Sequence, residues 1–469
     1  MLTDKIKLRM KPPQEAMAND PVRLLLLKMA GPSVIAMLMQ ALYNTVDSMY
    51  VARISDGSLA AVTIAFPVQM IMGALSTGIG VGINSSISRA LGAKDTESAS
   101  KSAANGLMIG LLTVAVMILF GLFGAQPFVS MYTDDPEVLV AGTIYVRTIC
   151  LLGFGSIFSQ LGFSVLQGSG NMIFPMMSQL CGGLAVILID PLLIFGLDMG
   201  VLGAAVASSM AQTISMLIGF YGIFVANKSN LPVSFRGFRP DIAIIKDIMY
   251  VGIPAALTQA TTSIVAGIIT KEIAAYGTSA IAVYGAYNKL STFASLPVFG
   301  ITRGMNPILG YCVGARNKSR FNEAEKTAAI IANTWTFAAF CIFAIFPRYL
   351  LMSMHATPEM MEIGIKSFRL LCLNLLFLGS SIVMVQIFAP LKKAQISMAS
   401  AFLRQLVFLV PLTMMLSKIW GLYGIWIGMF LADLLNYLFV FAMNIWVRKK
   451  VFPTWDLPES SAETEMKGV

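Results

Sequence analysis

The chain has 469 residues, of which 57% are hydrophobic and only 12% are charged. A soluble globular protein carries about 25% charged residues, so this composition excludes a surface that faces mainly water. The net charge of +9 lies in short segments between apolar runs. This placement is typical of membrane topology and argues against a nucleic-acid-binding surface.

The apolar runs predict an all-α integral membrane protein with about twelve transmembrane helices, because each crossing needs roughly 20 residues. We expect a cytoplasmic tail at 1–20, an N-lobe of helices 1–6 at 21–226, a cytoplasmic linker at 227–247, a C-lobe of helices 7–12 at 248–450 and a cytoplasmic tail at 451–469. The helices are predicted to begin near Lys28, Ala60, Ala103, Val138, Met172, Gly200, Ile248, Ala280, Ala328, Ile365, Ile396 and Gly421.

Basic and acidic residues alternate between successive loops. Lys and Arg gather at both termini and in every second loop, whereas the intervening loops hold acids such as Asp134, Asp135 and Glu359. Short basic loops stay on the cytoplasmic side. We therefore predict a multi-pass protein of the cell (inner) membrane with both termini in the cytoplasm.

The two halves of the chain repeat one pattern at a constant shift of 222 positions. The matching residues are Pro32 and Pro254, Gly78 and Gly300, Gly82 and Gly304, Asn84 and Asn306, Gly92 and Gly314, and Arg147 and Arg369. An even number of helices in each half makes the repeat parallel, about an axis along the membrane normal. Two such lobes around a central cavity suit transport by alternating access.

Four stretches carry a family resemblance. They are Gly31-Pro32 with Tyr43-Asn44-Thr45-Val46-Asp47; Arg89-Ala90-Leu91-Gly92-Ala93; Ile189-Asp190-Pro191-Leu192-Leu193-Ile194-Phe195-Gly196 with Gly203-Ala204-Ala205-Val206-Ala207-Ser208; and Gly304-Met305-Asn306-Pro307-Ile308-Leu309-Gly310-Tyr311 with Gly314-Ala315-Arg316. In this order the chain resembles the multidrug and toxic compound extrusion (MATE) family over nearly its whole length.

The resemblance implies a secondary antiporter that exports organic, cationic and amphipathic compounds in exchange for H⁺ or Na⁺, without another cofactor. It is similar to the DinF-like branch, whose key carboxylates lie in the first and fifth helices, where this chain has Asp47 and Asp190. The branch also has an Asn four residues before the second carboxylate, and Val186 stands there instead. The implied partners are drug-like molecules and the bilayer, with no nucleic acid, and we expect a monomer.

Asp47 is the first candidate for cation or proton coupling. A charge at the bilayer centre costs about 2.5–3.5 kcal/mol, so the carboxyl should be paired, solvated or protonated. Gln40, Tyr43 and Asn44 lie three to seven residues earlier and share one helix face with it. This stripe predicts a cavity-facing surface that could also contact substrate; the alternative is hydrogen bonding that only joins helices.

Asp190 precedes Pro191 in an apolar run, and the proline frees a backbone carbonyl one turn earlier. A carboxylate beside such a carbonyl can hold a proton or a small cation, so Asp47 and Asp190 are also the candidate ligands for Na⁺. Ser208 and Gln212 share a face of the sixth helix and could complete the site. Two carboxylates in a low-dielectric lobe cannot easily both be ionised, which suggests that one carries the coupling ion.

The remaining candidates leave alternatives open. Asp433 either lines the C-lobe cavity or pairs with Arg404, and Met37 is a candidate for the cavity wall. No metal-ligand motif, nucleophile–base pair or nucleotide fingerprint is present, which disfavours an enzyme. The rival function is a lipid or lipid-linked oligosaccharide flippase. A cluster of basic residues in the cavity would favour the flippase. The basic residues near the predicted helices are Arg147, Lys289, Arg303, Arg369 and Arg404.

Overall fold

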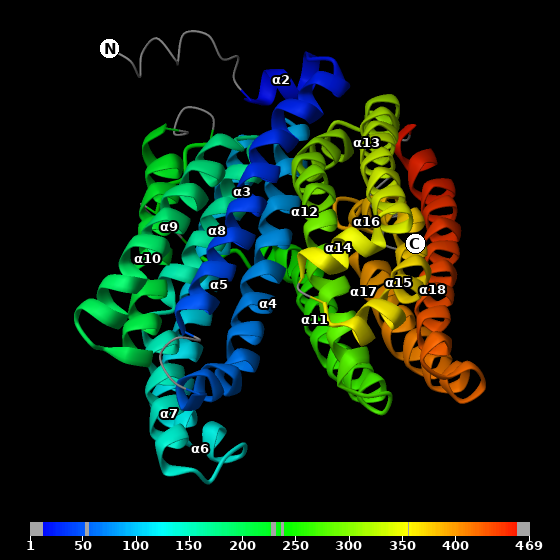
Figure 1. The fold of residues 1–469 in the computed structure, drawn as a ribbon. Coiled ribbons are helices and arrows are strands. Elements are labelled where there is room, and N and C mark those ends of the chain that lie inside the picture. Colours follow the sequence, from blue (N-terminus) through cyan, green and yellow to red (C-terminus); the bar gives the residue numbers. More distant parts are fainter. Residues whose placement is uncertain (1–12, 52–55, 227–230, 236–238, 355, 457–469) are drawn as a thin grey trace.

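The structure is a computed structural model that describes residues 13–51, 56–226, 231–235, 239–354 and 356–456. Within these ranges every regular element is helical, which confirms the predicted all-α class (Figure 1). The α-helices are α2 (Pro13–Asn19), α3 (Val22–Val51), α4 (Asp56–Gly92), α5 (Thr96–Leu119), α6 (Ala125–Ser130), α7 (Pro136–Leu151), α8 (Phe154–Gly168), α9 (Ile173–Pro191), α10 (Gly200–Tyr221), α11 (Ile242–Ala274), α12 (Thr278–Gly314), α13 (Lys318–Ile345), α14 (Pro347–Ser353), α15 (Pro358–Leu371), α16 (Leu375–Gln386), α17 (Ala394–Phe402) and α18 (Val410–Val451).

Short helical turns of other pitch continue several of these helices. The π-helical turns are Phe120–Gly124, Leu192–Gly196, Gly222–Ala226 and Leu403–Leu409, and the 3₁₀ turns are Cys372–Asn374 and Phe452–Asp456.

In the described ranges, nine or ten of the roughly twelve expected crossings are found as long apolar helical segments. Nine segments are long and apolar enough to span a membrane, and the pair α7–α8, bent by 41°, is a tenth. With 37 residues, α12 is long enough to be another. The last apolar segment, Ala394–Trp455, holds two spans, because Gly421 interrupts it with a φ of 59°.

Several helices begin before the positions predicted from hydropathy, because capped polar turns extend them beyond their apolar runs. The Asp95 carboxylate accepts from the Ser98 N–H at the start of α5, and the Asn317 side chain accepts from the Arg320 N–H at the start of α13. Such caps satisfy backbone donors that the helix leaves unpaired. α11 likewise begins at Ile242, inside the predicted linker 227–247, of which 227–230 and 236–238 lie outside the described residues.

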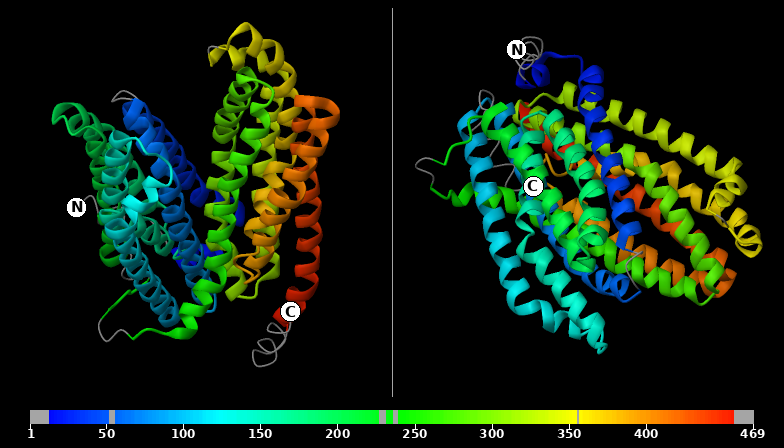
Figure 2. Two further views of the ribbon diagram at one scale, coloured as in Figure 1. Left: turned by 90° about the horizontal axis from the view of Figure 1, so that it is seen from below. Right: turned by 60° about the vertical axis from the view of Figure 1, so that its left-hand side comes forward.

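The two lobes, α3–α10 and α11–α18, converge at one end of the molecule and diverge at the other (Figure 2). They meet where α4 packs against α11 and where α12 packs against α3 and α4. This interface follows the sequence repeat. A Cβ at Gly78 would overlap Gly252 and Ala256 of α11, and a Cβ at the equivalent Gly300 would overlap Val34 of α3. The second helix of each lobe therefore packs closely against the first helix of the other, which glycine permits.

The convergent end is also joined by charge. The Arg89 guanidinium, at the end of α4, lies 2.5 Å from the Asp247 carboxylate of α11. The Lys392 ammonium, between α16 and α17, lies 2.7 Å from the other oxygen of the same carboxylate. Residues of the N-lobe and the C-lobe thus share one ion-pair network here.

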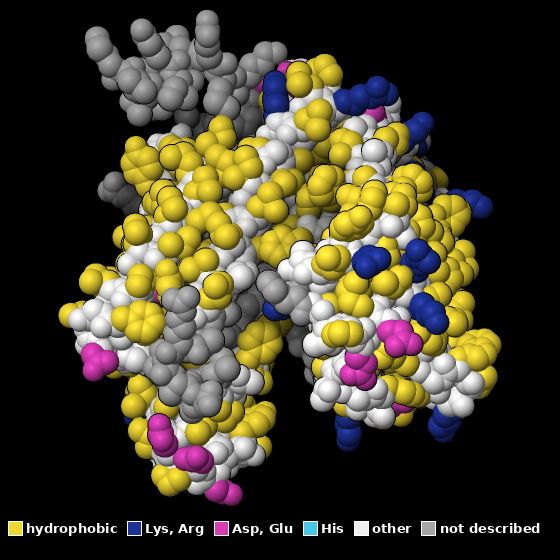
Figure 3. Space-filling view, in the orientation of Figure 1, with side chains coloured by type: hydrophobic (Ala, Val, Ile, Leu, Met, Phe, Trp, Pro, Cys, Tyr) yellow, Lys and Arg dark blue, Asp and Glu magenta, His cyan; other side chains and the backbone are white. Residues whose placement is uncertain are grey.

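The surface fits a lipid environment. Figure 3 shows hydrophobic side chains over most of this face, Lys and Arg along its upper rim and also on its right-hand side and lower edge, and a hollow between the lobes in its lower half. Leu111, Leu188 and Phe337 are each more than half exposed. Such apolar exposure is unfavourable in water and expected in a bilayer.

Candidate functional site

The two acidic side chains singled out in the N-terminal half meet inside the N-lobe. Asp47 lies on α3 and Asp190 near the end of α9, and their carboxyl groups interact directly. Asp190 is fully buried, and neither of its carboxyl oxygens has a hydrogen bond of ordinary geometry in the described chain. A buried carboxyl in this state needs a proton or a cation, because an unpaired charge there is unfavourable.

The local sequence explains how Asp190 reaches this place. Pro191 ends α9, and the next five residues, Leu192–Gly196, form a wider π-helical turn. Proline lacks an N–H and so leaves the carbonyl one turn earlier without its helical donor. The regular helix therefore breaks directly beside the buried carboxyl. Such bulges occur frequently at functional sites.

Hydrogen bonds connect the acidic pair to two other helices of the lobe. The Ser208 hydroxyl on α10 donates to Asp47 Oδ1 at 3.5 Å. One turn further along α10, the Gln212 amide donates to the Tyr43 hydroxyl at 3.4 Å and accepts from the Ser159 hydroxyl of α8 at 3.2 Å. The predicted Ser208 and Gln212 thus reach Asp47 and Tyr43 from one helix face, whereas Ser159 was not predicted.

Tyr145 is a second residue that the sequence reasoning missed. It is buried on α7, its hydroxyl accepts from the Gln69 amide at 3.2 Å, and it interacts electrostatically with both Asp47 and Asp190. A phenol in an apolar run is an available signal. It was not decisive because tyrosines also serve as ordinary helix-packing residues.

Val186, one helical turn before Asp190 on α9, is an apolar residue. Val186 is buried and forms a small hydrophobic cluster with Tyr43 and Ala211. It provides no oxygen where the DinF-like branch has an amide. Asn44 lies exposed on α3, and Gln40 lies half-buried beside Tyr43. The polar face of α3 therefore contributes Tyr43 and Asp47 most directly.

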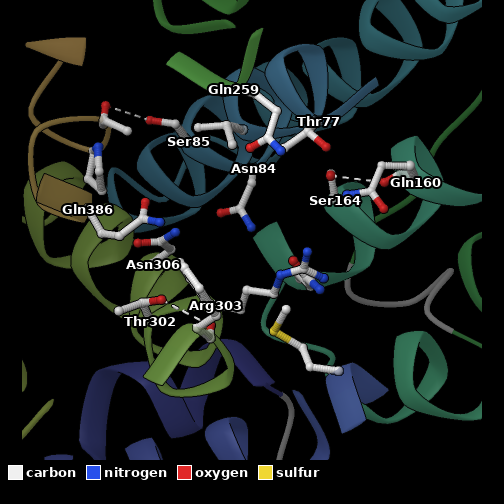
Figure 4. A pocket seen from close by; sticks show the side chains of 17 residues that line it. Thr77, Asn84, Ser85, Gln160, Ser164, Gln259, Thr302, Arg303, Asn306 and Gln386 are labelled. Atoms are coloured by element: carbon white, nitrogen blue, oxygen red, sulfur yellow. Dashed lines mark hydrogen bonds between the residues drawn. The ribbon is translucent and has the colours of Figure 1, made fainter. Parts of the chain in front are cut away.

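A separate cavity of about 200 Å³ lies between the lobes. Its wall is rich in amides and hydroxyls, and Figure 4 shows the labelled Asn84, Asn306, Gln386 and Arg303 side chains around it. The lining residues are Met37, Thr77, Gly80, Val81, Asn84, Ser85, Gln160, Ser164, Gln167, Gln259, Phe299, Thr302, Arg303, Asn306, Gln386, Ala389 and Pro390. Because both lobes contribute, the shape of this cavity must change when the lobes move.

The predicted cavity residues are distributed over different places. Met37 lines the inter-lobe cavity, whereas Gln40, Tyr43 and Gln212 are not among its lining residues. Asp433 is not among them either; its carboxylate lies 2.5 Å from the Arg404 guanidinium, so the pairing alternative is the one observed.

The other basic candidates do not gather in the cavity. Arg303 alone among the five lines it, and Arg147, Lys289 and Arg369 are exposed elsewhere. The single histidine, His355, lies outside the described residues. Across the described ranges no three His, Cys, Asp or Glu side chains are grouped so that they could hold a metal ion.

Comparison with known proteins agrees with this geometry. The MatE family model matches residues 32–192 and 254–415, one match in each half and most of the chain in total. The chain belongs to the MATE family of transporters. It is 28% identical over 337 residues to the multidrug export protein MepA of Staphylococcus aureus (strain MSSA476), covering 70% of this chain and 72% of that protein.

Two further relatives extend the likeness over nearly the whole MATE fold. MepA of the bovine strain RF122 of S. aureus is 25% identical over 426 residues, or 88% of this chain and 92% of the relative. A crystal structure of a MATE protein in complex with MaL6 is 25% identical, with a TM-score of 0.87 over 94% of this chain and 100% of that one. As a MATE transporter, the protein is not an enzyme.

Proposed function

We propose that this protein is a multidrug efflux antiporter that exports organic compounds in exchange for protons by alternating access. The observation that carries the proposal is the contact between Asp47 and the fully buried Asp190 in the N-lobe. Acidic side chains within membrane-spanning helices are rare, and they are typical of proton and ion pathways. The similarity to MepA, a multidrug export protein, supports the substrate class.

The surroundings of the pair favour H⁺ over Na⁺ as the coupling ion. A hard cation prefers a shell of about six oxygens. Among the described residues, the Ser208 hydroxyl contacts Asp47, and Val186, four residues before Asp190, is buried in an apolar cluster with Tyr43 and Ala211. Two adjacent carboxyls can hold one proton between them without further ligands. Coupling to Na⁺ is the alternative that the experiment below distinguishes.

The direction of transport follows from topology and membrane potential. We place the upper end of Figure 1, with the starts of α3 and α13, in the cytoplasm. The diverging ends of the lobes in Figure 2 then face outward. A proton that binds from outside and leaves inside gains about 2.3 kcal/mol per 100 mV. This gain drives export if proton and substrate favour opposite conformations.

The flippase alternative has less support. A cavity for anionic lipid-linked sugars should collect several cations, but Arg303 is the lining residue that carries one. The expected preference for cationic substrates stays a prediction. The cavity wall itself does not favour it, because its lining residues include no Asp or Glu.

Proteoliposomes test the proposal. Uptake of a rhodamine-class dye should be driven by an acidic lumen, abolished by a protonophore, and lost in Asp47→Asn and Asp190→Asn. Glu362→Gln is the matched control, because Glu362 is an exposed acid on α15. Uptake driven by a lumenal Na⁺ gradient alone would assign Na⁺ to the pair. Uptake that ignores both gradients would exclude the antiporter, and gradient-driven uptake at wild-type rates in both Asn variants would exclude the acidic pair as its coupling site.

A further inference from the structure

The cavity between the lobes lies on the pseudo-two-fold axis of the molecule. Gly80, Val81 and Asn84 of α4 line it, and so do Thr302, Arg303 and Asn306 of α12. Each residue of the first set is related to one of the second by the repeat shift of 222 positions. The same face of two equivalent helices therefore forms opposite walls of one cavity.

The symmetry of this wall is broken by one charge. Asn84 and Asn306 are identical at their equivalent positions, but Val81 of α4 is replaced by Arg303 in α12. Figure 4 shows the Arg303 side chain extending toward the open centre of the cavity. A packing role alone does not require a cation at a position where the repeat places valine.

Arg303 has no acidic partner in the described chain. Its guanidinium forms no ion pair there, and its one electrostatic neighbour is the Tyr43 side chain. The other lining residues are amides, hydroxyls and apolar groups. A guanidinium removed from bulk water without a counter-charge is unfavourable, and binding an anion relieves this.

The wall also holds an unsatisfied acceptor. Asn306 Oδ1 is buried and has no hydrogen-bond partner among the described residues. Asn306 lies one helical turn from Arg303 on α12, so both side chains can contact the same ligand. The Arg303 guanidinium can bind an anionic group, and Asn306 Oδ1 can accept a hydrogen bond from a hydroxyl or N–H next to that group.

We infer that this cavity is a binding site for the anionic group of an organic substrate, with Arg303 as the charged contact and Asn306 as the acceptor. The inference rests on the proposed efflux function, because the bound anion is a substrate only if the protein exports it. A volume of about 200 Å³ is below the 300–1,000 Å³ usual for drug-sized ligands. The cavity therefore fits a carboxylate, sulfonate or phosphate group whose remainder extends into the cleft.

The site is distinct from the acidic pair but connected to it. Tyr43 lies within electrostatic range of both Arg303 and Asp47, and its hydroxyl accepts from Gln212. The charge of an anion bound to Arg303 would thus influence Asp47, with Tyr43 as the intervening side chain. Substrate binding at Arg303 and proton binding at the acidic pair can therefore be coupled.

Dye binding to the purified full-length protein in phosphatidylcholine nanodiscs tests the inference. The probes are a fluorescein-class anionic dye and a rhodamine-class cationic dye of similar ring size, each followed by fluorescence anisotropy. The wild type should bind the anionic dye. Because a hydrogen bond to a charged group is worth about 1.5–3 kcal/mol, Arg303→Gln should weaken binding by about 10- to 100-fold. Arg303→Lys should restore part of the affinity.

Arg147→Gln is the matched control, because Arg147 is an exposed membrane-helix arginine on α7, and it should leave the affinity unchanged. Two outcomes overturn the site: wild-type affinity for the anionic dye in Arg303→Gln, or equal loss of both dyes that Arg303→Lys does not reverse. Nanodiscs with added phosphatidylglycerol separate the sources of the anion. Arg303-dependent displacement of the dye assigns a lipid headgroup, and no displacement assigns a soluble organic anion.

The two proposals can fail separately. If the anionic dye never binds but rhodamine transport stays proton-driven and dependent on Asp47, the anion site is wrong and the antiporter stands. If the anionic dye binds through Arg303 but no gradient drives transport, the antiporter is wrong and the anion site stands.

Discussion

Arg89 at the end of α4 donates to Asp247 of α11 at 2.5 Å, and this contact joins the two lobes at their convergent end. The Arg89 side chain is 10% exposed and that of Asp247 is 22% exposed, so solvent screens the pair only partly. Lys392 reaches the same carboxylate from the C-lobe. An ion pair in this position stabilises the arrangement in which this end of the cleft is closed.

We expect Asp247→Asn to shift the protein toward conformations open at this end. The substitution leaves the buried Arg89 without its carboxylate, which corresponds to about 1.5–3 kcal/mol for a charged hydrogen bond, or at least a tenfold change in population. Spin labels at Glu97 and Ser319, near the starts of α5 and α13, should report longer distances. Lys28→Gln is the control, because it removes an exposed pair with Asp20. An unchanged distance distribution in Asp247→Asn would show that the ion pair does not hold this end closed.

Ser208→Ala should weaken coupling without abolishing it. The Ser208 hydroxyl donates one long hydrogen bond to Asp47, and a hydrogen bond of this kind contributes about 0.5–1.5 kcal/mol. Proton-driven dye transport should therefore fall by roughly 2- to 10-fold, compared with complete loss in Asp47→Asn. Ser169→Ala, a change of the same type after α8, provides the control. A complete loss of proton-driven transport in Ser208→Ala would mean that the hydroxyl itself binds the coupling ion.

Asp433→Asn should lower thermal stability more than the double variant Arg404→Gln/Asp433→Asn. The single change leaves the Arg404 guanidinium without its partner inside the C-lobe, whereas the double change removes both charges. Thermal unfolding in detergent should show a loss of several degrees for the single variant and recovery of much of it in the double variant. Proton coupling should persist in the double variant. Loss of proton coupling in the double variant would give Asp433 a role in transport beyond its ion pair with Arg404.

Gly314→Ala should destabilise the contact between the lobes. A Cβ at this position would overlap the Arg89 carbonyl, and a Cβ at the equivalent Gly92 would overlap the Tyr311 carbonyl. Backbone cannot move aside as a side chain can, so we expect a loss of about 1–3 kcal/mol. Gly285→Ala on the same helix is the matched control, because its Cβ would meet nothing within 4 Å. Equal melting temperatures for the two variants would contradict the close packing described here.

Much of the fold could be predicted because hydropathy and the repeat are strong signals. The acidic pair was accessible for the same reason: Asp47 and Asp190 stand out within apolar helices. Helix starts were predicted too late, since caps such as Asp95 extend helices into polar sequence that hydropathy does not include.

The central cavity was harder to predict. A membrane helix is apolar on both its lipid-facing and its buried faces, so periodicity does not reveal which face points inward. The repeat related Arg303 to Val81 in sequence, but only their position on the inter-lobe wall shows that the two line one cavity. For Asp433, the sequence was consistent with a place in the cavity wall and with an ion pair to Arg404. The packing of α18 shows the ion pair.

The central claim, that Asp47 and Asp190 carry the proton exchanged for substrate, is tested most directly by proton release. A transported dye is added to the purified protein in weakly buffered solution near neutral pH, and the released protons are counted with a pH indicator. The account predicts release from the wild type and none from Asp47→Asn/Asp190→Asn, with dye binding retained in both. Equal release from the double variant, or no release from a wild type that transports the dye, would contradict it.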